Sequence, residues 1–387
     1  MEQKKRILFL CATYPPSPGG IARHVSDLAR TLAGAGFEVH VLTRDTTGAP
    51  AEEIITGVRV KRILTRRSKR FSTIRFIQQT IAYVFYIKPD LIHSHELYLP
   101  SLVAVLAKLI FRIPLIITIH TQGPSIGDIA VVQRARLGKF RWFIFRQLVD
   151  KFIAISQVLE TEMSVAGIPA SQQVRIPNSI DMTRFAPVGD DAKCGLRQDL
   201  HLPNGPIIVM SGRLVWEKRV QNMLEIWPSI RDKFSDACLL VIGSGEYEQD
   251  FRGRRIPGVF VLGETEDVVS FLQASDILVM LSVYEGFSLS TLEGLACALP
   301  VVATPVGAVP EMIVHRKTGW IVPVDDLDAL RNAICTLLEN PAVRSELGKS
   351  GHKSVVHNYS LEISLERLIS LYNQSLGIKT TNVPNKI

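Results

Sequence analysis

Two glutamates on one short stretch of the chain could bind the hydroxyl groups of a single ligand. Glu285 precedes a glycine, and Glu293 follows eight positions later in a helical pattern. Apolar runs at 274–281 and 299–304 flank this stretch and predict buried strands, so the segment is typical of a strand–turn–helix–strand unit. The turn of such a unit lies at the carboxyl edge of a parallel sheet, where open α/β folds bind ligands. Both carboxylates can then face one ligand without being neighbours.

The predicted helix begins with a candidate anion-binding site. Gly286 allows the chain to turn, and the amides of Phe287, Ser288 and Leu289 lie at the helix N-terminus. Such amides lack partners within the helix and carry the positive end of its dipole. An anionic group bound there, with hydroxyls on either side, describes a nucleotide sugar. A plain helix with one loop glutamate and one surface glutamate has the same spacing and is the competing interpretation.

Two cations and several glycines could bind a diphosphate. Arg213 and Lys218 follow a predicted strand, and arginine offers a planar fork where lysine offers a point charge. Gly19 and Gly20 lie between the first predicted strand and helix, and Gly243 ends another predicted strand. Glycine lets backbone amides approach a phosphate closely. A solvated basic loop and an ordinary turn after prolines are the competing interpretations.

A histidine ends one of the predicted strands. His120 follows the apolar run 115–119, which places the imidazole at the sheet edge, where it could donate a hydrogen bond or handle a proton. A single histidine in such a place more often belongs to the core. His93 and His95 end another predicted strand, and we expect them to shape the site rather than to react.

The sequence predicts no metal and no other cofactor. It contains no Cys/His cluster at metal-binding spacing. The cations at Arg213 and Lys218, together with a helix N-terminus, can offset the charge of a leaving phosphate without a metal ion.

The residues above belong to an ordered set of short segments that resembles one family. The resemblance is to the retaining GT-B glycosyltransferases of the group-one (family four) type, and it runs from about residue 5 to about residue 330. Each segment alone is weak, but their order along the chain is specific. The segments are Pro15–Gly20 with His24-Val25, Ile92–His95, Thr118–His120, Asn178–Asp181 with Phe185, Ser211–Leu214 with Glu217-Lys218, Val241–Gly245, Glu285–Ile313 and Thr318–Trp320.

The resemblance implies an α/β fold of the GT-B type, with two Rossmann-like domains whose parallel sheets face across a cleft. We expect an acceptor-binding domain at residues 1–184 and a domain that binds the nucleotide sugar at 185–358. A C-terminal helix at 359–378 is expected to pack back on the N-terminal domain. The alternation of strand and helix patterns in both halves favours the same fold class independently, and 387 residues suffice for two domains.

The resemblance also implies roles for individual residues. Arg213 and Lys218 match positions that bind the donor pyrophosphate, Glu293 matches the glutamate that bonds the ribose hydroxyls, and Glu285 matches a contact to the transferred sugar. His120 matches a histidine at the donor sugar or the reacting centre. Transfer is then expected to retain the anomeric configuration without a metal, by front-side attack in which the leaving phosphate helps to take the acceptor proton.

The chain departs from the family pattern at several positions. Arg219 stands where glycine is usual and adds a third positive charge to its loop. Ser288, Gly294 and Ala298 replace the usual glycine, alanine and glycine. These changes exchange one small residue for another, and they could shift the preference for one sugar over another.

Charge is spread unevenly along the chain. Residues 1–184 carry 25 Lys and Arg against 13 Asp and Glu, and residues 185–387 carry 19 against 24, so the formal charges are +12 and −5. Basic segments at 59–75 and 134–146 interleave cations with aromatic and aliphatic residues. Basic helices of this kind suit an anionic membrane surface, and a solvated face is an equal alternative. The residues expected at the membrane are Arg66, Arg67, Lys69 and Arg70.

Other classes of partner and location follow from what the sequence lacks. No nucleic-acid recognition motif accompanies the basic segments, so nucleic acid is not expected as a partner. The five cysteines are scattered and indicate free thiols in a reducing cytosol. We therefore expect a cytoplasmic protein, in solution or peripheral on the inner face of the cell membrane.

The predicted function is transfer of a sugar from a nucleotide-sugar donor, UDP-linked in the first place, to a hydroxyl of a lipid-linked or membrane-proximal glycan in the synthesis of a cell-surface polysaccharide. One alternative is a glycosyltransferase with a soluble small-molecule acceptor. A second is a nucleotide-sugar 2-epimerase of the same fold, which needs no acceptor. A third is a non-catalytic protein that keeps the fold, although the joint presence of His120, Arg213, Lys218, Glu285 and Glu293 argues against it.

Overall fold

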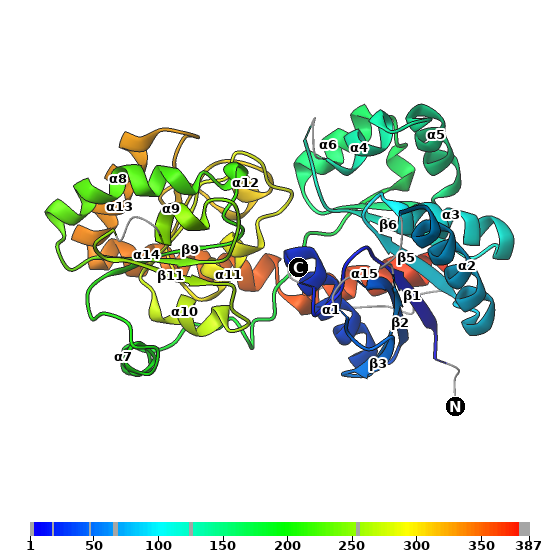
Figure 1. Cartoon of the computed structure of the whole chain (residues 1–387), viewed down its shortest axis with the longest axis horizontal. Helices are drawn as coiled ribbons and strands as arrows, with labels where there is room; N and C mark the ends of the chain where they lie inside the picture. The colour runs from blue at the N-terminus through cyan, green and yellow to red at the C-terminus, as the bar shows by residue number, and fades with distance from the viewer. Residues whose placement is uncertain are drawn as a thin grey trace. The chain divides into compact units, whose positions relative to one another are not determined.

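The computed structural model describes residues 4–17, 19–45, 48–64, 69–123, 127–252 and 256–378, without the side chains of 45 and 69–71. The chain divides into two compact units (Figure 1). The first unit combines Met1–Asn178 with Leu361–Ile387, and the second unit is Ser179–Ser360.

The first unit is built on an eight-stranded sheet in the order β3-β4-β2-β1-β5-β6-β7-β8. All neighbouring strands are parallel except β3 and β4. The strand order reverses between β1 and β5, where Ile7 pairs with Val39 on one side and Leu91 on the other. The strands are β1 (Arg6–Leu10), β2 (Glu38–Asp45), β3 (Glu52–Ile55), β4 (Val58–Leu64), β5 (Leu91–His95), β6 (Leu115–Ile119), β7 (Lys151–Ala154) and β8 (Gln173–Arg175).

Helices cover both faces of this sheet, with α2, α3 and α5 packed in a row and α1 packed on α15 (Figure 1). Buried Leu368 and Tyr372 of α15 join Phe9 and Val41 in the core, so the last helix completes the core of the first unit. The helices are α1 (Gly20–Gly34), α2 (Lys69–Ile87), α3 (Leu99–Phe111), α4 (Asp128–Arg134), α5 (Gly138–Leu148), α6 (Gln157–Val165) and α15 (Leu361–Ser375).

The prediction of a basic helix across 59–75 is wrong in its first part. Val58–Leu64 forms β4, in which exposed Arg59 alternates with buried Val58 and Val60. Thr56 and Gly57 both have positive φ angles, 46° and 84°, which is typical of a type I′ turn, and they join β3 to β4 as a hairpin. The turn signal is weak in sequence because threonine rarely adopts this conformation.

The second unit holds a six-stranded, fully parallel sheet in the order β11-β10-β9-β12-β13-β14. This is the doubly wound order, and it reverses between β9 and β12, where Ile208 pairs with Ile277. The strands are β9 (Ile207–Ser211), β10 (Cys238–Ile242), β11 (Val259–Gly263), β12 (Ile277–Met280), β13 (Val301–Ala303) and β14 (Trp320–Ile321).

The core of the second unit gathers around Trp227, whose indole N–H donates to the Pro257 carbonyl at 2.9 Å. Leu239, Val241 and Leu337 pack in the same cluster. The helices are α7 (Asp190–Asp199), α8 (Val220–Lys233), α9 (Glu248–Arg252), α10 (Val268–Ala274), α11 (Leu289–Ala296), α12 (Val309–Met312), α13 (Leu327–Glu339) and α14 (Pro341–Asn358), with a short 3₁₀ turn at Trp216–Lys218. Another 3₁₀ turn, Ala170–Gln172, belongs to the first unit.

The most apolar stretch of the chain, 102–119, forms most of α3 and all of β6. None of the described helices combines the length and apolar character needed to cross a membrane. All five cysteines are free thiols.

Candidate active site

The predicted donor residues gather where the strand order of the second unit reverses. β9 ends at Ser211 and β12 ends at Met280, and a small cavity lies between the loops that follow them. Open α/β sheets bind ligands in the crevice at such a reversal, outside the carboxyl ends of the strands. The residues that line the cavity include Ser211, Gly212, Arg213, Lys218 and Ser282.

An ion pair joins two of these predicted residues. The Lys218 ammonium contacts Glu285 Oε1, and the Ser282 hydroxyl donates to the same oxygen at 2.9 Å. Both charged side chains are largely buried, with 20% and 14% of their surface exposed. Each charge therefore offsets the desolvation cost of the other, and the Glu285 carboxylate holds the Lys218 ammonium beside the cavity.

Glycines bring the β9 and β10 loops together. A Cβ atom at Gly243 would lie 1.9 Å from the Gly212 carbonyl oxygen, so this position excludes any side chain. The Leu214 amide donates to the Ser244 carbonyl at 2.8 Å. Gly243 is thus explained by packing between two loops. A Cβ placed on Gly212, which was not among the predicted site residues, would be in ordinary van der Waals contact with Ser290 Oγ at 3.8 Å and Lys218 Cε at 4.0 Å.

Helix α11 begins at Leu289, as the sequence predicts. Ser288 precedes it in the left-handed conformation with φ 59°, and its hydroxyl forms a hydrogen bond with Thr291 Oγ1 at 2.9 Å. The first amides of the helix have no acceptor within it and point toward its N-terminus. Phe287 is buried and packs edge-on against Tyr359, so it anchors the turn that begins at Gly286.

Glu293 lies one turn into α11 and is only 7% exposed. Burial of the Cys297 thiol, and after it the charge of the neighbouring Glu293, raise the pKa of Cys297 to about 12. A carboxylate can accept from both hydroxyls of a vicinal diol, and this is the role that the family resemblance predicts for Glu293.

The two extra cations of the β9 loop behave differently. Arg213 is exposed beside the cavity. Arg219 adopts the left-handed conformation with φ 48°, which glycine would adopt without strain. Its Nε donates to Asp325 at 2.9 and 3.2 Å, and its guanidinium lies over the Trp216 ring. The expected third positive charge of this loop is therefore engaged by Asp325.

In the first unit, His120 follows β6 at the carboxyl edge of the sheet and is 3% exposed. Its Nε2 lies 3.1 Å from His95 Nδ1. His93 is held by Tyr372 Oη at 2.6 Å and Thr118 Oγ1 at 2.7 Å. Burial and then the nearby His24 lower the pKa of His120 well below its ordinary value. The imidazole is therefore neutral at physiological pH and can donate or accept a hydrogen bond without carrying charge.

Sequence reasoning missed two carboxyl groups at this edge. Asp128 accepts from the His120 amide at 2.9 Å and from the Thr121 hydroxyl at 2.7 Å. Glu96 follows β5 with φ 68°, and its Oε2 is buried without a hydrogen-bond partner among the described residues. Burial, and after it the charge of Asp128, raise the pKa of Glu96 to about 7. A hydrogen bond from the Ala12 backbone lowers this pKa and so opposes the shift in part. Its place directly after His95 at a strand end was the available signal.

Gly19 and Gly20 lie at the same edge of the first unit, between β1 and α1. Gly19 has φ 126° and precedes the helix, and no described atom lies within 4 Å of a Cβ placed on it. Both residues are exposed at the N-terminus of a 15-residue helix, a position that suits an anion.

The remaining predictions concern the membrane and metals. Arg66 and Arg67 fall outside the described residues, and Lys69 and Arg70 belong to the first turn of α2 with side chains that are not described. In the described ranges, no group of three or more His, Cys, Asp or Glu side chains has a geometry that could hold a metal ion.

Comparison with known proteins assigns the family. The model of the glycosyltransferase family 4 matches residues 18–184, and the model of the glycosyl transferases group 1 matches residues 205–340. The chain belongs to the group 1, family 4 glycosyltransferases. The family resemblance of the sequence motifs is thereby confirmed, and the enzyme is a glycosyltransferase.

Two curated relatives illustrate the range of the match. A GDP-mannose-dependent monoacylated α-(1-6)-phosphatidylinositol monomannoside mannosyltransferase of Corynebacterium glutamicum is 32% identical over 210 residues. That match covers 51% of this chain and 55% of the relative, so the chain spans about half of its length. An uncharacterized glycosyltransferase of Methanocaldococcus jannaschii is 25% identical over 95% of this chain and 97% of its own.

Solved structures confirm the fold. Sucrose-phosphate synthase from Thermosynechococcus elongatus superposes with a TM-score of 0.81 at 24% identity and covers 97% of this chain and 100% of that one. HepE of Anabaena, in complex with UDP-glucose, superposes with a TM-score of 0.79 at 18% identity, over 95% and 99% of the two chains. The predicted GT-B fold, with two Rossmann-like domains, is confirmed.

Proposed function

We propose that the enzyme transfers a sugar from a nucleotide-sugar donor to an acceptor hydroxyl with retention of the anomeric configuration. The observation that carries the proposal is the Lys218–Glu285 ion pair beside the exposed Arg213, at the strand reversal of the second unit. A cation and a carboxylate held together at one edge suit a ligand that joins a diphosphate to a hydroxyl-rich ring.

The donor is bound by complementary groups. Arg213, Lys218 and the first amides of α11 bind the diphosphate and offset the negative charge that develops as it leaves. Glu285 accepts hydrogen bonds from the transferred sugar, and Glu293 accepts them from the ribose. The leaving phosphate takes the proton of the acceptor hydroxyl, so transfer needs neither a metal nor a protein nucleophile.

The acceptor hydroxyl is assigned to the carboxyl edge of the first unit. Neutral His120 and Glu96, whose pKa is raised to about 7, give this edge buried hydrogen-bonding groups for an acceptor hydroxyl. Three buried atoms there, Glu96 Oε2, His95 Nε2 and His120 Nδ1, lack hydrogen-bond partners among the described residues. Such unsatisfied atoms favour a polar ligand, because unpaired buried polar groups are costly.

A UDP-linked sugar remains the predicted donor. The name of the Corynebacterium relative specifies GDP-mannose, whereas HepE was crystallised with UDP-glucose. GDP-mannose is therefore the main competitor, and a donor screen must include both.

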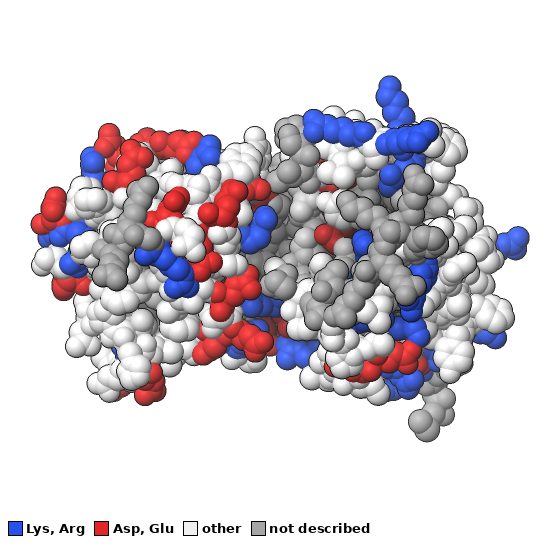
Figure 2. All heavy atoms as spheres, in the orientation of Figure 1, with Lys and Arg blue, Asp and Glu red and all other residues white. Residues whose placement is uncertain are grey.

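A lipid-linked or membrane-proximal glycan is the proposed acceptor. Exposed apolar side chains gather on the packed helices α3 and α5, and Figure 2 shows basic side chains projecting over the region of α4 and α5. An apolar face rimmed by cations suits an anionic membrane. The Corynebacterium relative is named for a lipid acceptor. The exposed apolar residues are Leu106, Leu109, Ile110, Leu137, Phe140 and Phe143.

The transfer itself is tested by incubating the protein with UDP- and GDP-sugars and membrane lipid extract in the presence of EDTA, with proton NMR of the product. A product with the donor's anomeric configuration supports the proposal. An inverted product, a requirement for a divalent metal, or conversion of the donor to its 2-epimer without any acceptor contradicts it.

Membrane binding is tested by sedimentation with phosphatidylglycerol vesicles. Phe140→Ser with Phe143→Ser, and separately the charge reversal of Arg66, Arg67, Lys69 and Arg70 to glutamate, should each lower the bound fraction. Phe260→Ser, at an exposed aromatic of the second unit, is the matched control and should bind as the wild type does. Unaltered binding of both test variants contradicts membrane association.

A further inference from the structure

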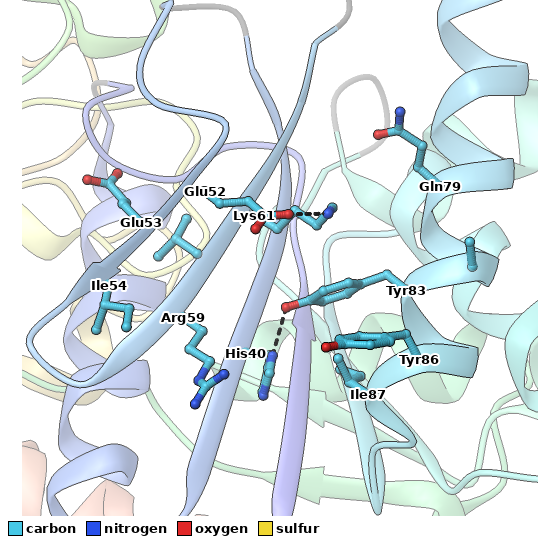
Figure 3. Close-up of a pocket in the computed structure, with 12 residues that line it drawn as sticks. His40, Glu52, Glu53, Ile54, Arg59, Lys61, Gln79, Tyr83, Tyr86 and Ile87 are labelled. Carbon is cyan, nitrogen blue, oxygen red and sulfur yellow. Dashed lines mark hydrogen bonds and ion pairs between the residues drawn. The ribbon is translucent and has the colours of Figure 1, made fainter.

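A groove of about 700 Å³ opens on the first unit between the β3–β4 hairpin and α2 (Figure 3). This volume lies within the range of about 300–1,000 Å³ that is typical of small-molecule sites. His40 of β2 forms part of its floor and pairs with Arg59 of β4, the second strand from one edge of the sheet. The groove therefore lies over a sheet face, away from the carboxyl ends of β5 and β6, where Glu96 and His120 follow.

The charges that line the groove balance one another. Lys61 forms an ion pair with Glu52, and Glu53 pairs with the buried Arg62 behind the hairpin. Arg59 is exposed on the groove side of β4. Both lining carboxylates, Glu52 and Glu53, are thus already paired with a cation, and Arg59 adds a guanidinium to the lining. With the carboxylates neutralised within the chain, the groove offers hydrogen-bonding groups to an uncharged, hydroxyl-rich ligand.

His40 adds polarity without adding charge. Its ring nitrogens lie 2.7 Å from the Tyr83 hydroxyl and 2.9 Å from Glu38 Oε1. Burial lowers the pKa of His40, and the carboxylate of Glu38 opposes this shift only in part. Both ring nitrogens of His40 are thus engaged within the protein, and the imidazole fixes the position of the Tyr83 hydroxyl in the groove.

Aromatic rings form one wall. Tyr83 and Tyr86 extend from the same face of α2 toward the strands, as Figure 3 shows, with Ile54 on the hairpin opposite. Tyr86 is 82% exposed and Ile54 is 71% exposed. The Lys61 ammonium lies 5.1 Å from the centre of the Tyr83 ring. Tyrosine combines an apolar ring with a polar hydroxyl, and such side chains are enriched at binding surfaces.

We infer that this groove is a second carbohydrate site, which binds an uncharged oligosaccharide. A sugar ring has an apolar face of C–H groups, which stacks on tyrosine, and a rim of hydroxyls, which bond to paired carboxylates, guanidinium and amide. Arg59, Glu52 and Gln79, which line the same groove as Tyr86, supply these groups. Oligosaccharide binding stands on the groove alone. The further inference that the groove binds a growing acceptor glycan at a distance from its reacting end rests on the proposed function.

Isothermal titration of the full-length protein with maltohexaose, mannohexaose, cellohexaose and laminarihexaose tests the inference. At least one should bind, and Tyr86→Ala should weaken that binding about tenfold because the stacking platform is lost. Arg59→Ala should weaken it several-fold. Phe85→Ala is the matched control, because Phe85 is the neighbouring residue on α2, is 66% exposed and does not line the groove. It should leave binding unchanged.

Two results would overturn the inference. The first is that no hexasaccharide of the panel binds the wild type, and the second is that Tyr86→Ala and Phe85→Ala weaken binding equally. If Tyr86→Ala instead lowers sedimentation with phosphatidylglycerol vesicles while no sugar binds, the groove is a lipid site and the inference is wrong. Donor binding, measured as a nucleotide-sugar thermal shift, reports on the second unit and separates this failure from failure of the proposed function.

Discussion

The two units present carboxyl edges of opposite chemical character. The edge of the second unit carries Lys218 and Glu285 as a charged pair, with Arg213 exposed beside them. The edge of the first unit carries buried histidines with lowered pKa values and a glutamate, Glu96, with a raised one. One edge therefore presents an ion pair, whereas at the other edge burial favours the neutral forms of the histidines and of Glu96.

The difference follows from what each edge is proposed to bind. A diphosphate needs cations and helix amides that stay charged or polar while the leaving group forms. An acceptor hydroxyl needs hydrogen-bonding groups, and a permanent charge beside the reacting atoms would attract or repel the donor. A parallel sheet of the same general topology thus serves two kinds of ligand through the side chains that follow its strands.

Loss of the ammonium at the charged edge should have the largest effect. Lys218→Ala removes a cation from the leaving phosphate and leaves Glu285 without its partner, so kcat should fall about 100- to 1,000-fold. Arg219→Ala is the matched control from the same loop, and about a twofold change is expected because its exposed guanidinium bonds to Asp325. Donor hydrolysis and sugar transfer are both measured. Equal losses in the two variants would remove the basis for treating this edge as the donor site.

The neutral edge should reveal itself in the pH dependence of stability. Folded Glu96 keeps its proton up to about pH 7, whereas the unfolded chain releases it near 4.5. The contribution of Glu96 to the free energy of unfolding is fully present below pH 4.5. It falls by about 3 kcal/mol as the pH rises from 4.5 to about 7.

Glu96→Gln removes that titration. The free energy of unfolding of the variant, relative to the wild type, should therefore increase by about 3 kcal/mol between pH 4.5 and 7.5. Urea denaturation at a series of pH values measures the difference, in which the contributions of the histidines cancel. A difference that stays constant over this range would show that Glu96 is not desolvated.

A substitution in the packing of α11, below the edge that carries Lys218 and Glu285, should have the smallest effect on stability. Gly294 of α11 stands where the family usually has alanine, and a Cβ there would lie 3.2 Å from Leu278 and Val301 side-chain atoms. Gly294→Ala gains helix propensity but crowds these neighbours, so it should destabilise the protein by less than about 1 kcal/mol.

A second helical glycine provides the contrast. A Cβ at Gly348 would lie 2.0 Å from the Ala298 carbonyl oxygen, so Gly348→Ala should cost about 3 kcal/mol or more in thermal unfolding. Equal effects of the two substitutions would contradict the packing described for α11 and α14.

Much of the fold could be predicted from the sequence. Apolar runs such as 115–119 and 277–281 identify buried parallel strands, because both faces of such strands are covered. The β3–β4 hairpin escaped prediction because its strands are rich in charged residues and its turn places threonine at positive φ. Helix α14 was missed because its burial is set by small residues such as Gly348 and Gly351 rather than by an apolar stripe.

Site residues that directly follow a strand could be predicted from the sequence. Contacts between residues far apart in the sequence could not. The family resemblance predicted that Lys218 and Glu285 both belong to the donor site, but only the structure shows that they form an ion pair. Nothing in the sequence signals the raised pKa of Glu96, because the burial of a side chain depends on distant neighbours such as Asp128. The engagement of Arg219 by Asp325, 106 positions away, was hidden for the same reason.

Donor binding at the charged edge is the central claim, and a thermal-shift titration with UDP-, GDP- and ADP-sugars tests it most directly. One nucleotide sugar should stabilise the wild type by about 2.7 kcal/mol at one hundred times its dissociation constant. Glu293→Ala should lose most of that shift, and the 2′-deoxy form of the nucleotide should bind wild type and variant alike. A shift that survives in Glu293→Ala would contradict the ribose contact, and the absence of a shift with every nucleotide sugar would contradict the donor site itself.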